Sequence, residues 1–332
     1  MKRAFLKTLL AAAALTAFGC AGAQTRTIKF ANQNAKGHPI IMGMEKFAEL
    51  VEAKSGGKLK VTVFPGGTLG SDQANLSALQ GGTLEMASMN SGIFASIVKD
   101  FEIYDFPFLF GDAKEADAVV DGPFGASLHK KLEDKGIVGL AYYELGFREL
   151  TNSKRPITKV EDIAGLKLRV IPNAINIDWV SALGANPTPL PFPELYSALE
   201  QHAVDGQENP VATIQGAKLY EVQKYMTLTN HQYNPQSVVI SKKFWDTLSP
   251  AEHKAVQDAA LESALYQRQQ SRAAAAGILE NLKKNGMQVS ELAPAEVAKL
   301  REKMKPVIAK HTAGVGEATV KAVMAEIDKA RK

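Results

Sequence analysis

Arg169 is the residue best placed to bind an acidic ligand. It lies near the end of segment 166–170, in which apolar and charged residues alternate as in a β-strand, shortly before a turn at Pro172. The ends of strands in α/β folds commonly present the groups that contact a ligand. A guanidinium forms two parallel hydrogen bonds with a carboxylate and keeps its proton at neutral pH. We therefore expect Arg169 to hold a carboxylate, although a lone arginine on a strand is more often a solvated surface charge.

Two further side chains are candidates for the same ligand. Arg148 follows a predicted strand where the chain is expected to cross between two lobes, and an ion pair with Glu149 or Glu144 is the simpler interpretation. Asn209 lies in a predicted polar turn and offers one hydrogen-bond acceptor and two donors, which suit a carboxylate or a hydroxyl.

The first part of the chain adds polar candidates that follow predicted strands. Gln33, His38 and Asn90 each occupy such a position, and each alone is more readily a turn residue than a ligand contact. Together they predict at least one ligand contact. Phe192, between two prolines, could form an apolar wall against a sugar ring or simply pack in the core.

The sequence lacks the patterns typical of enzymes and metalloproteins. No two of its six histidines have metal-ligand spacing with a partner acid, and neither a nucleophile elbow nor a paired glycine fingerprint occurs. The glycine-rich turn 65–70 lacks the ending of a P-loop, so we interpret it as structural, with Ser71 or Asp72 capping the next helix. We expect no catalytic residue, no cofactor and no metal.

Residues 1–23 have the pattern of an export signal. Basic residues precede the apolar stretch 9–18, and a small-residue cleavage site ends at Ala23. Cleavage before Cys20, with lipid attachment, is the less favoured alternative. Removing the three basic residues of this segment lowers the formal net charge from +4 to +1, so nucleic-acid binding is not expected. The predicted location is the periplasm.

Strand and helix patterns alternate along the chain, which is typical of an α/β fold. Strands are predicted near 27–30, 58–64, 84–89, 137–143, 166–170, 225–231 and 237–241, and helices near 40–54, 113–135, 176–183 and 194–201, with a polar turn at 204–210. A helix of about 35 residues from Pro250 would span roughly 50 Å and bridge two lobes. We expect one lobe from 24–146 plus 235–274 and another from 147–234 plus 275–332, with the helical tail packing on the second.

Four motifs in order carry a resemblance to a known family. They are D-x-x-G-L-K-L-R-V (162–170), A-L-G-A-N-P (182–187), P-F-P-E-L-Y-x-A-L-E (191–200) and V-D-G-Q-E-N-P (204–210). With this order and spacing, the chain resembles the DctP-type solute-binding proteins of tripartite ATP-independent periplasmic (TRAP) transporters. The resemblance implies a two-lobed periplasmic binding protein with mixed sheets flanked by helices and a long helix spanning both lobes.

The resemblance also implies roles and partners. Arg169, the arginine of K-L-R-V, would hold the ligand carboxylate, and Glu208 and His231 would form a network that orients Arg148. The protein would be a monomer that delivers an organic acid to a separate membrane permease driven by an ion gradient. We favour a hexuronate or an aldonate as the ligand. The alternatives are a C4-dicarboxylate or keto acid, or a role as the ligand-sensing subunit of a membrane receptor.

Overall fold

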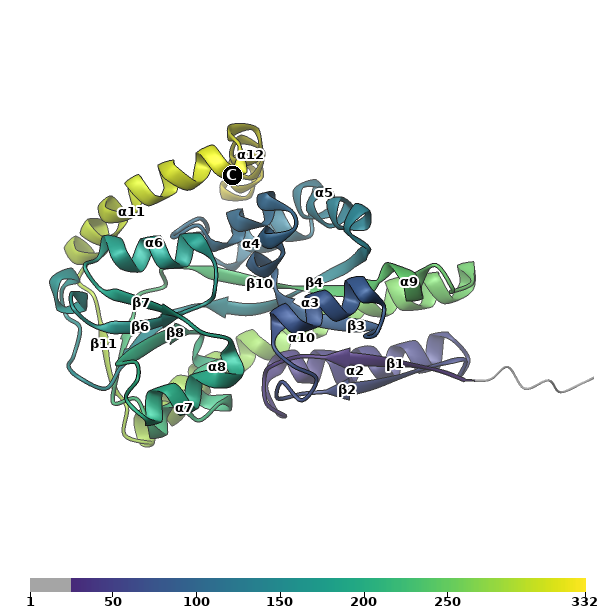
Figure 1. Cartoon of the computed structure of the whole chain (residues 1–332), viewed down its shortest axis with the longest axis horizontal. Helices are drawn as coiled ribbons and strands as arrows, with labels where there is room; N and C mark the ends of the chain where they lie inside the picture. Colours follow the sequence, from purple (N-terminus) through teal and green to yellow (C-terminus); the bar gives the residue numbers. More distant parts are fainter. Residues whose placement is uncertain (1–24) are drawn as a thin grey trace, which may run out of the picture.

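The computed structural model of the chain describes residues 25–332 and contains two β-sheets flanked by helices (Figure 1). The predicted export signal, including Cys20, lies outside the described residues. The first sheet has the order β2-β1-β3-β10-β4. Its strands are β1 (Arg26–Ala31), β2 (Leu59–Phe64), β3 (Met86–Asn90), β4 (Ile137–Phe147) and β10 (Tyr233–Ser241). β1 is parallel to β2 and β3, whereas β10 is antiparallel to β3 and β4.

The second sheet has the order β11-β9-β5-β8-β6-β7. Its strands are β5 (Glu149–Asn152), β6 (Lys167–Val170), β7 (Asn186–Pro189), β8 (Gly206–Asn209), β9 (Tyr225–Leu228) and β11 (Gln288–Glu291). β6 is parallel to β7 and β8, and β5 is antiparallel to β8 and β9. The carboxyl ends of β1 and β3 in one sheet, and of β6 and β8 in the other, carry residues of one cavity, described below.

The predicted polar turn at 204–210 is wrong, because β8 is a buried strand between β5 and β6. Its polar side chains are satisfied inside the fold. Gln207 Nε2 donates to Thr151 Oγ1 at 2.9 Å, and Glu208 accepts from Arg148. Polar residues can therefore form an interior strand here because tertiary partners replace water.

Helices cover both sheets. They are α2 (Pro39–Lys54), α3 (Asp72–Gly81), α4 (Ala113–Val120), α5 (Pro123–Leu132), α6 (Ala174–Ala182), α7 (Leu195–Glu200), α8 (Val211–Gly216), α9 (Lys242–Trp245), α10 (Pro250–Lys284), α11 (Pro294–Val315) and α12 (Glu317–Arg331), with a 3₁₀ segment η2 (Lys99–Asp105) among them. Alternate residues of β3 face opposite sides, so Met86 packs with α2 and α10, while Ala87 packs with α3, α4 and α5.

The single helix predicted at 113–135 is instead two helices, α4 and α5. Pro123 begins α5, and Gly122 is its N-cap. A Cβ at Gly122 would lie 2.4 Å from the carbonyl oxygen of Ala118, so this glycine permits a tight turn between the helices. Proline at the first helical position has no N–H to satisfy, which explains why a new helix starts there.

The long helix predicted from Pro250 is confirmed. α10 has 35 residues and begins with a capping box formed by Ser249 and Glu252. Its first half packs with the first sheet through residues such as Val256, and Leu282 near its end belongs to the core cluster of α7, α8 and β9. α10 therefore runs past both sheets, as Figure 1 shows.

The C-terminal tail differs from the expectation that it packs on the second lobe. α11 lies against α6, but α12 packs against α4 and α5 of the first sheet. Val323 and Ile327 are fully buried, and Arg331 forms an ion pair with Glu115 at 2.7 Å. The tail thus connects the two halves. The exact lobe boundaries given above stay a prediction.

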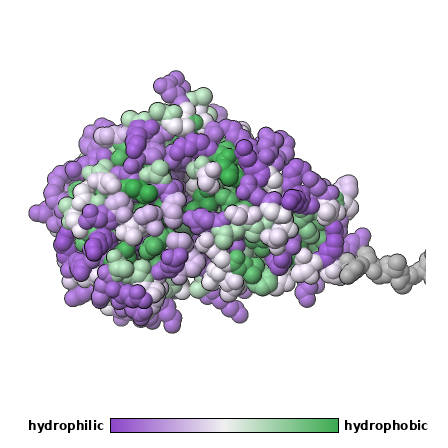
Figure 2. Space-filling model, in the orientation of Figure 1, coloured by the Kyte–Doolittle hydropathy of each residue, from purple (hydrophilic) through white to green (hydrophobic). Residues whose placement is uncertain are grey.

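Within residues 25–332, no helix combines the length and apolar character needed to cross a bilayer. In the view of Figure 2, hydrophilic residues cover most of the surface, with smaller hydrophobic areas between them.

Candidate functional site

A cavity lies between the two sheets and is partly open to solvent. Most of the predicted site residues line it: Arg169, Arg148, Asn209, Asn90, Gln33 and Phe192. Further lining residues that the sequence did not single out as ligand contacts are Asn34, Asp72, Gln73, Ile93, Leu145, Ile171, Pro172, Pro191, Thr213 and Gln236. Its location at the carboxyl ends of parallel strands is the usual place for ligand binding in open α/β sheets.

Arg169 is held rigidly in the cavity wall but has no ionic partner. It is 2% exposed, on a strand between β7 and β8, and its Nε donates to the carbonyl oxygen of Leu190 at 2.9 Å. Its Cζ lies 5.9 Å from the centre of the Phe192 ring, a cation–π arrangement. Within residues 25–332 the guanidinium forms no ion pair, and its two terminal nitrogens make no hydrogen bond. Burial lowers the pKa of Arg169 to about 10, so it remains a cation at neutral pH.

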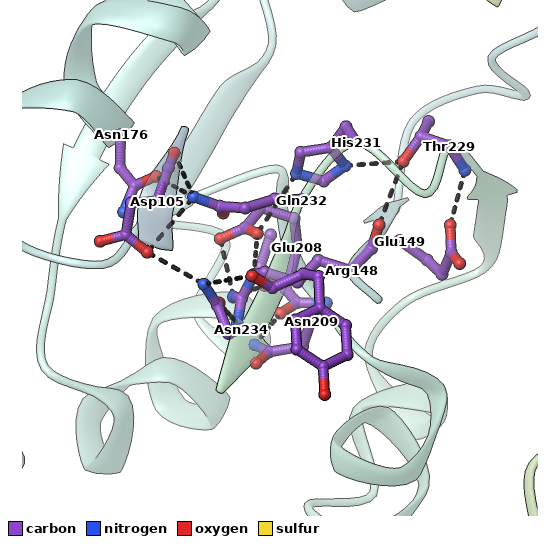
Figure 3. Close-up of polar contacts among 12 residues, drawn as sticks. Asp105, Arg148, Glu149, Asn176, Glu208, Asn209, Thr229, His231, Gln232 and Asn234 are labelled. Carbon is purple, nitrogen blue, oxygen red and sulfur yellow. Dashed lines mark hydrogen bonds and ion pairs between the residues drawn. The ribbon is translucent and has the colours of Figure 1, made fainter. Parts of the chain in front are cut away.

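Arg148 is also buried, but its charge is neutralised. Its Nε and Nη2 bind the two carboxylate oxygens of Glu208, the second at 2.8 Å, and its Nη1 donates to Asn234 Oδ1 at 2.9 Å (Figure 3). Asn234 Nδ2 in turn donates to Asp105 Oδ1 at 2.9 Å. Burial alone would raise the pKa of Glu208, but the charge and hydrogen bonds of Arg148 and the contact with His231 together outweigh it, and the pKa falls to about 2. The pair is therefore ionised and fixed.

His231 lies on the other side of Glu208, as Figure 3 shows. Its Nε2 is 3.4 Å from Glu208 Oε2, and its Nδ1 is 2.8 Å from Thr229 Oγ1. The ring of Trp179 packs against the imidazole, with 4.8 Å between ring centres. The structure thus brings together the three residues of the predicted network, although its action on a ligand stays a prediction.

The cavity contains buried polar atoms that have no hydrogen-bond partner within residues 25–332. They are Gln33 Oε1, Asp72 Oδ1 and Asn90 Nδ2. Asn209 donates from Nδ2 to Gln207 Oε1 at 2.5 Å, and its Oδ1 makes no further hydrogen bond. Buried polar groups are nearly always paired in folded proteins, so these atoms point to a polar ligand with both donors and acceptors.

Asp72 is the acid that the sequence interpretation missed as a site residue. The helix cap is Ser71, whose side chain accepts from Ala74 N, and Asp72 is the next residue, 3% exposed and in the cavity wall. Burial raises the pKa of Asp72 to about 7, although the backbone N–H of Asn90 and the charge of Arg169 act to lower it. An acid at a helix start is usually solvated, so no sequence pattern pointed to Asp72 as a residue of the cavity wall.

His38 is not among the residues that line the cavity, unlike the other predicted contacts. Both ring nitrogens have protein partners, Ile40 N at 3.1 Å and Thr213 Oγ1 at 3.2 Å. The imidazole is therefore occupied by the helix start and by a neighbouring helix. Nothing in this geometry supports a direct contact of His38 with a ligand.

Within the part of the chain that the structure describes, no three histidine, cysteine or acidic side chains are grouped as metal ligands. The cavity offers hydrogen-bonding side chains and the guanidinium of Arg169, which forms no ion pair within residues 25–332. The sequence identifies the family. Residues 30–314 match the model of the bacterial extracellular solute-binding proteins, family 7 (DctP).

The chain belongs to this family.

Individual relatives share both sequence and fold. The 2,3-diketo-L-gulonate-binding periplasmic protein YiaO of Escherichia coli (strain K12) is 37% identical over 277 residues, which cover 83% of this chain and 84% of that protein. The sugar acid binding protein DctPAm from Advenella mimigardefordensis, solved in complex with galactonate, is 42% identical, with a TM-score of 0.91 over 92% of this chain and 99% of that one.

A TRAP periplasmic solute-binding protein from Ochrobactrum anthropi is also similar, at 57% identity and a TM-score of 0.83 over 93% of this chain and 97% of that one. In that crystal structure the C-terminus is bound in the ligand-binding pocket. The present chain is thus a TRAP-type solute-binding protein for organic acids. It has the two-lobed α/β fold predicted from the sequence. The family consists of transporter binding proteins rather than enzymes.

Proposed function

We propose that this DctP family member is a periplasmic protein that captures a sugar acid, a hexuronate or an aldonate, for TRAP-type secondary import. Two lobes close around a carboxylate that Arg169 holds. Arg148, Asn209, Asn90, Gln33 and Phe192 complete the set of ligand contacts, and Glu208 and His231 support Arg148.

The observation that carries this proposal is the buried guanidinium of Arg169, which has no ion pair within residues 25–332. Burial of a charge is costly, and the negative charges of Glu208 and Asp72 offset only part of that cost, so an anion bound at the free end of the guanidinium would be stabilised. The two terminal nitrogens of Arg169 have the fork geometry that a carboxylate matches with two hydrogen bonds. The C-terminus bound in the Ochrobactrum anthropi pocket supports a carboxylate at this place.

The remaining polar atoms favour hydroxyl groups over a second carboxylate. Arg148 cannot serve as a second free cation, because Glu208 already neutralises it. Gln33 Oε1 and Asp72 Oδ1 accept no hydrogen bond within residues 25–332, so a ligand hydroxyl could donate to either of them. The galactonate complex of the Advenella protein and the diketogulonate specificity in the name of YiaO support a sugar acid in preference to a C4-dicarboxylate.

The proposed mechanism follows from the electrostatics of a closing cleft. In an open form the guanidinium of Arg169 would be hydrated. Closure expels water, and the lower local dielectric strengthens the ion pair with the ligand carboxylate. The sugar hydroxyls would meanwhile engage the first lobe through Gln33 and Asn90, so that one ligand bridges both lobes and favours the closed form.

The partners and location follow from the family and remain part of the proposal. The closed form would deliver its ligand to a TRAP permease in the membrane, and the protein would act in the periplasm as a monomer. No nucleic acid, cofactor or metal has a part in this function.

The test is a thermal-shift and calorimetric screen against galactonate, gluconate, glucuronate, galacturonate, succinate and malate. A ligand at 100 times its Kd adds about 2.7 kcal/mol of stability, which shifts the Tm by several degrees. We expect shifts with hydroxylated sugar acids that vanish in Arg169→Met and persist in Lys303→Met, a control that removes one exposed charge. A preference for succinate would refute the sugar-acid class, and binding that is unchanged in Arg169→Met would refute the carboxylate clamp.

A further inference from the structure

His38 and Thr213 form a hydrogen bond between the two lobes. His38 is the N-cap of α2, which packs on the first sheet, whereas Thr213 lies on α8, which follows β8 of the second sheet. The atoms His38 Nε2 and Thr213 Oγ1 are 3.2 Å apart, and the two residues are 3% and 2% exposed. A buried hydrogen bond between the two lobes stabilises the form in which they are in contact.

The geometry fixes the proton on the imidazole. His38 Nδ1 accepts the backbone N–H of Ile40 at 3.1 Å, so this nitrogen carries no proton. In the neutral ring the proton is therefore on Nε2, which donates it to Thr213 Oγ1. Protonation at Nδ1 would remove the acceptor for Ile40 N and place a charge in this buried site, whereas the bond from Nε2 to Thr213 Oγ1 would keep its donor.

The bond lies beside the proposed ligand site, and a second close contact joins the same two parts of the chain. Thr213 lines the cavity that contains Arg169. The second contact joins the loop before α3 to the loop before α7, where a Cβ at Gly67 would lie 3.1 Å from Pro193 Cγ. Both contacts would break if the lobes separated to admit a ligand.

We propose that His38 is a positioning residue that latches the closed form, through its hydrogen bond to Thr213, over a bound ligand. This proposal rests on the proposed function only for the identity of the enclosed ligand, an organic acid. The hydrogen bond that holds the two lobes together does not depend on which ligand is bound. His38 does not contact the ligand in this scheme. It acts on the lifetime of the closed complex.

The latch makes closure sensitive to acid. Burial lowers the pKa of His38 to about 3, and no charged side chain within residues 25–332 forms an ion pair with it. An imidazole exposed by opening would titrate near 6.5. Neutral His38 favours the closed form, so closure is fully supported above about pH 6.5 and is weakened as the pH falls below it, by up to tenfold per unit. Asp72, Arg148 and Arg169 are the charged groups of the adjacent cavity.

Two variants separate the latch from the helix cap. His38→Asn keeps an N-cap acceptor for α2, since asparagine is among the best caps, but it is too short to preserve the ring's bond to Thr213. Thr213→Val removes the hydroxyl at nearly constant volume. Thr213→Ser, which keeps the hydroxyl, is the matched control.

The experiment measures the distance between the lobes without any ligand. Spin labels at Lys60→Cys on β2 and Glu200→Cys on α7, both exposed, in a Cys20→Ser background report the closed fraction by pulsed electron resonance at pH 7.5 and pH 5. We expect the wild type to open as the pH falls. His38→Asn and Thr213→Val should shift the closed-to-open ratio about fivefold towards open at pH 7.5. His38→Asn should lose most of the pH response, whereas Thr213→Val should keep it because His38 is still buried on closure. Thr213→Ser should behave as the wild type.

Equal distance distributions in the wild type, His38→Asn and Thr213→Val at both pH values would overturn the latch. A second readout uses galactonate: its dissociation rate should rise about fivefold in both variants, with little change in the association rate. Failure of the wild type to bind any acid in the screen would refute the proposed ligand, yet the distance measurement would still decide the latch. The two proposals can therefore fail separately.

Discussion

Replacing Arg169 by methionine should stabilise the unliganded protein and abolish ligand binding. A pKa of about 10, well below the usual value for arginine, reflects a burial cost. At about 1.4 kcal/mol per pKa unit this cost is about 3 kcal/mol at neutral pH. The cost is fully present below pH 10, because the guanidinium is then charged in the folded and the unfolded chain alike. Methionine removes the charge and fills a similar volume.

One loss opposes this gain. The carbonyl oxygen of Leu190 loses the hydrogen bond from Arg169 Nε, which contributes about 1 kcal/mol. The net expectation is that the free energy of unfolding increases by about 2 kcal/mol, and that the Tm of the unliganded protein rises by several degrees. Ligand affinity should fall by about 2–5 kcal/mol, which is roughly 30- to 5,000-fold in Kd, because a buried charge-assisted pair is removed.

The assay combines thermal unfolding with titration of the best sugar acid from the screen. Lys303→Met is the matched control, since its side chain is exposed and its replacement removes one positive charge without touching the cavity. A lower Tm for unliganded Arg169→Met, together with a Kd within threefold of the wild type, would show that Arg169 is a structural residue. A gain in stability together with a loss of binding would distinguish an arginine kept for ligand binding from one that stabilises the fold.

Three further predictions concern the surroundings of the site. Glu208→Gln leaves Arg148 charged and unpaired, so chemical denaturation should show a loss of about 3–5 kcal/mol, and the double variant Arg148→Met with Glu208→Leu should lose less than that single change; an equal or larger loss in the double variant would contradict the pairing. Burial raises the pKa of Asp72 from its usual value to about 7, so the folded protein binds more protons than the unfolded chain and its stability should decrease as the pH rises from about 4 to 7. Asp72→Asn should therefore increase the free energy of unfolding at pH 8 by about 3 kcal/mol more than at pH 5, and an equal increase at both pH values would argue against a titrating acid. Gly206→Ala would bring its Cβ to 2.2 Å from a backbone oxygen of β5, and should cost about 1–3 kcal/mol in thermal unfolding, whereas a wild-type Tm would show that β8 moves freely.

Sequence patterns predicted the parts of the fold that depend on local periodicity. The long helix α10 is encoded by the capping box at Ser249 and by an uninterrupted run of helix-forming residues. The strand carrying Arg169 is encoded by alternation. β8 was mistaken for a turn because its residues are polar, and their burial depends on partners such as Thr151, which lie far away in the sequence.

The site shows the same limit. Residue type and position before a turn singled out Arg169, but its lack of an ionic partner is a property of the folded chain. Asp72 looked like a helix cap, since a carboxylate at a helix start is ordinarily solvated, and its burial is a property of the folded chain. His38 was predicted as a ligand contact, but in the structure it caps α2 and does not line the cavity. Its bond to Thr213 depends on how the two parts of the chain meet, which the sequence alone does not show.

The two arginines of the cavity differ in whether an acidic side chain of the protein pairs with them. Both are buried, yet Arg148 is neutralised by a strand neighbour of its own sheet and Arg169 is not. A ligand with two carboxylates would therefore find one available cation and would place its second charge near Asp72, whose ionisation it would further oppose. A ligand with one carboxylate and several hydroxyls meets one cation and the unpaired acceptors of Gln33 and Asp72. The charge balance of the cavity is therefore the basis on which we propose a sugar acid rather than a dicarboxylate.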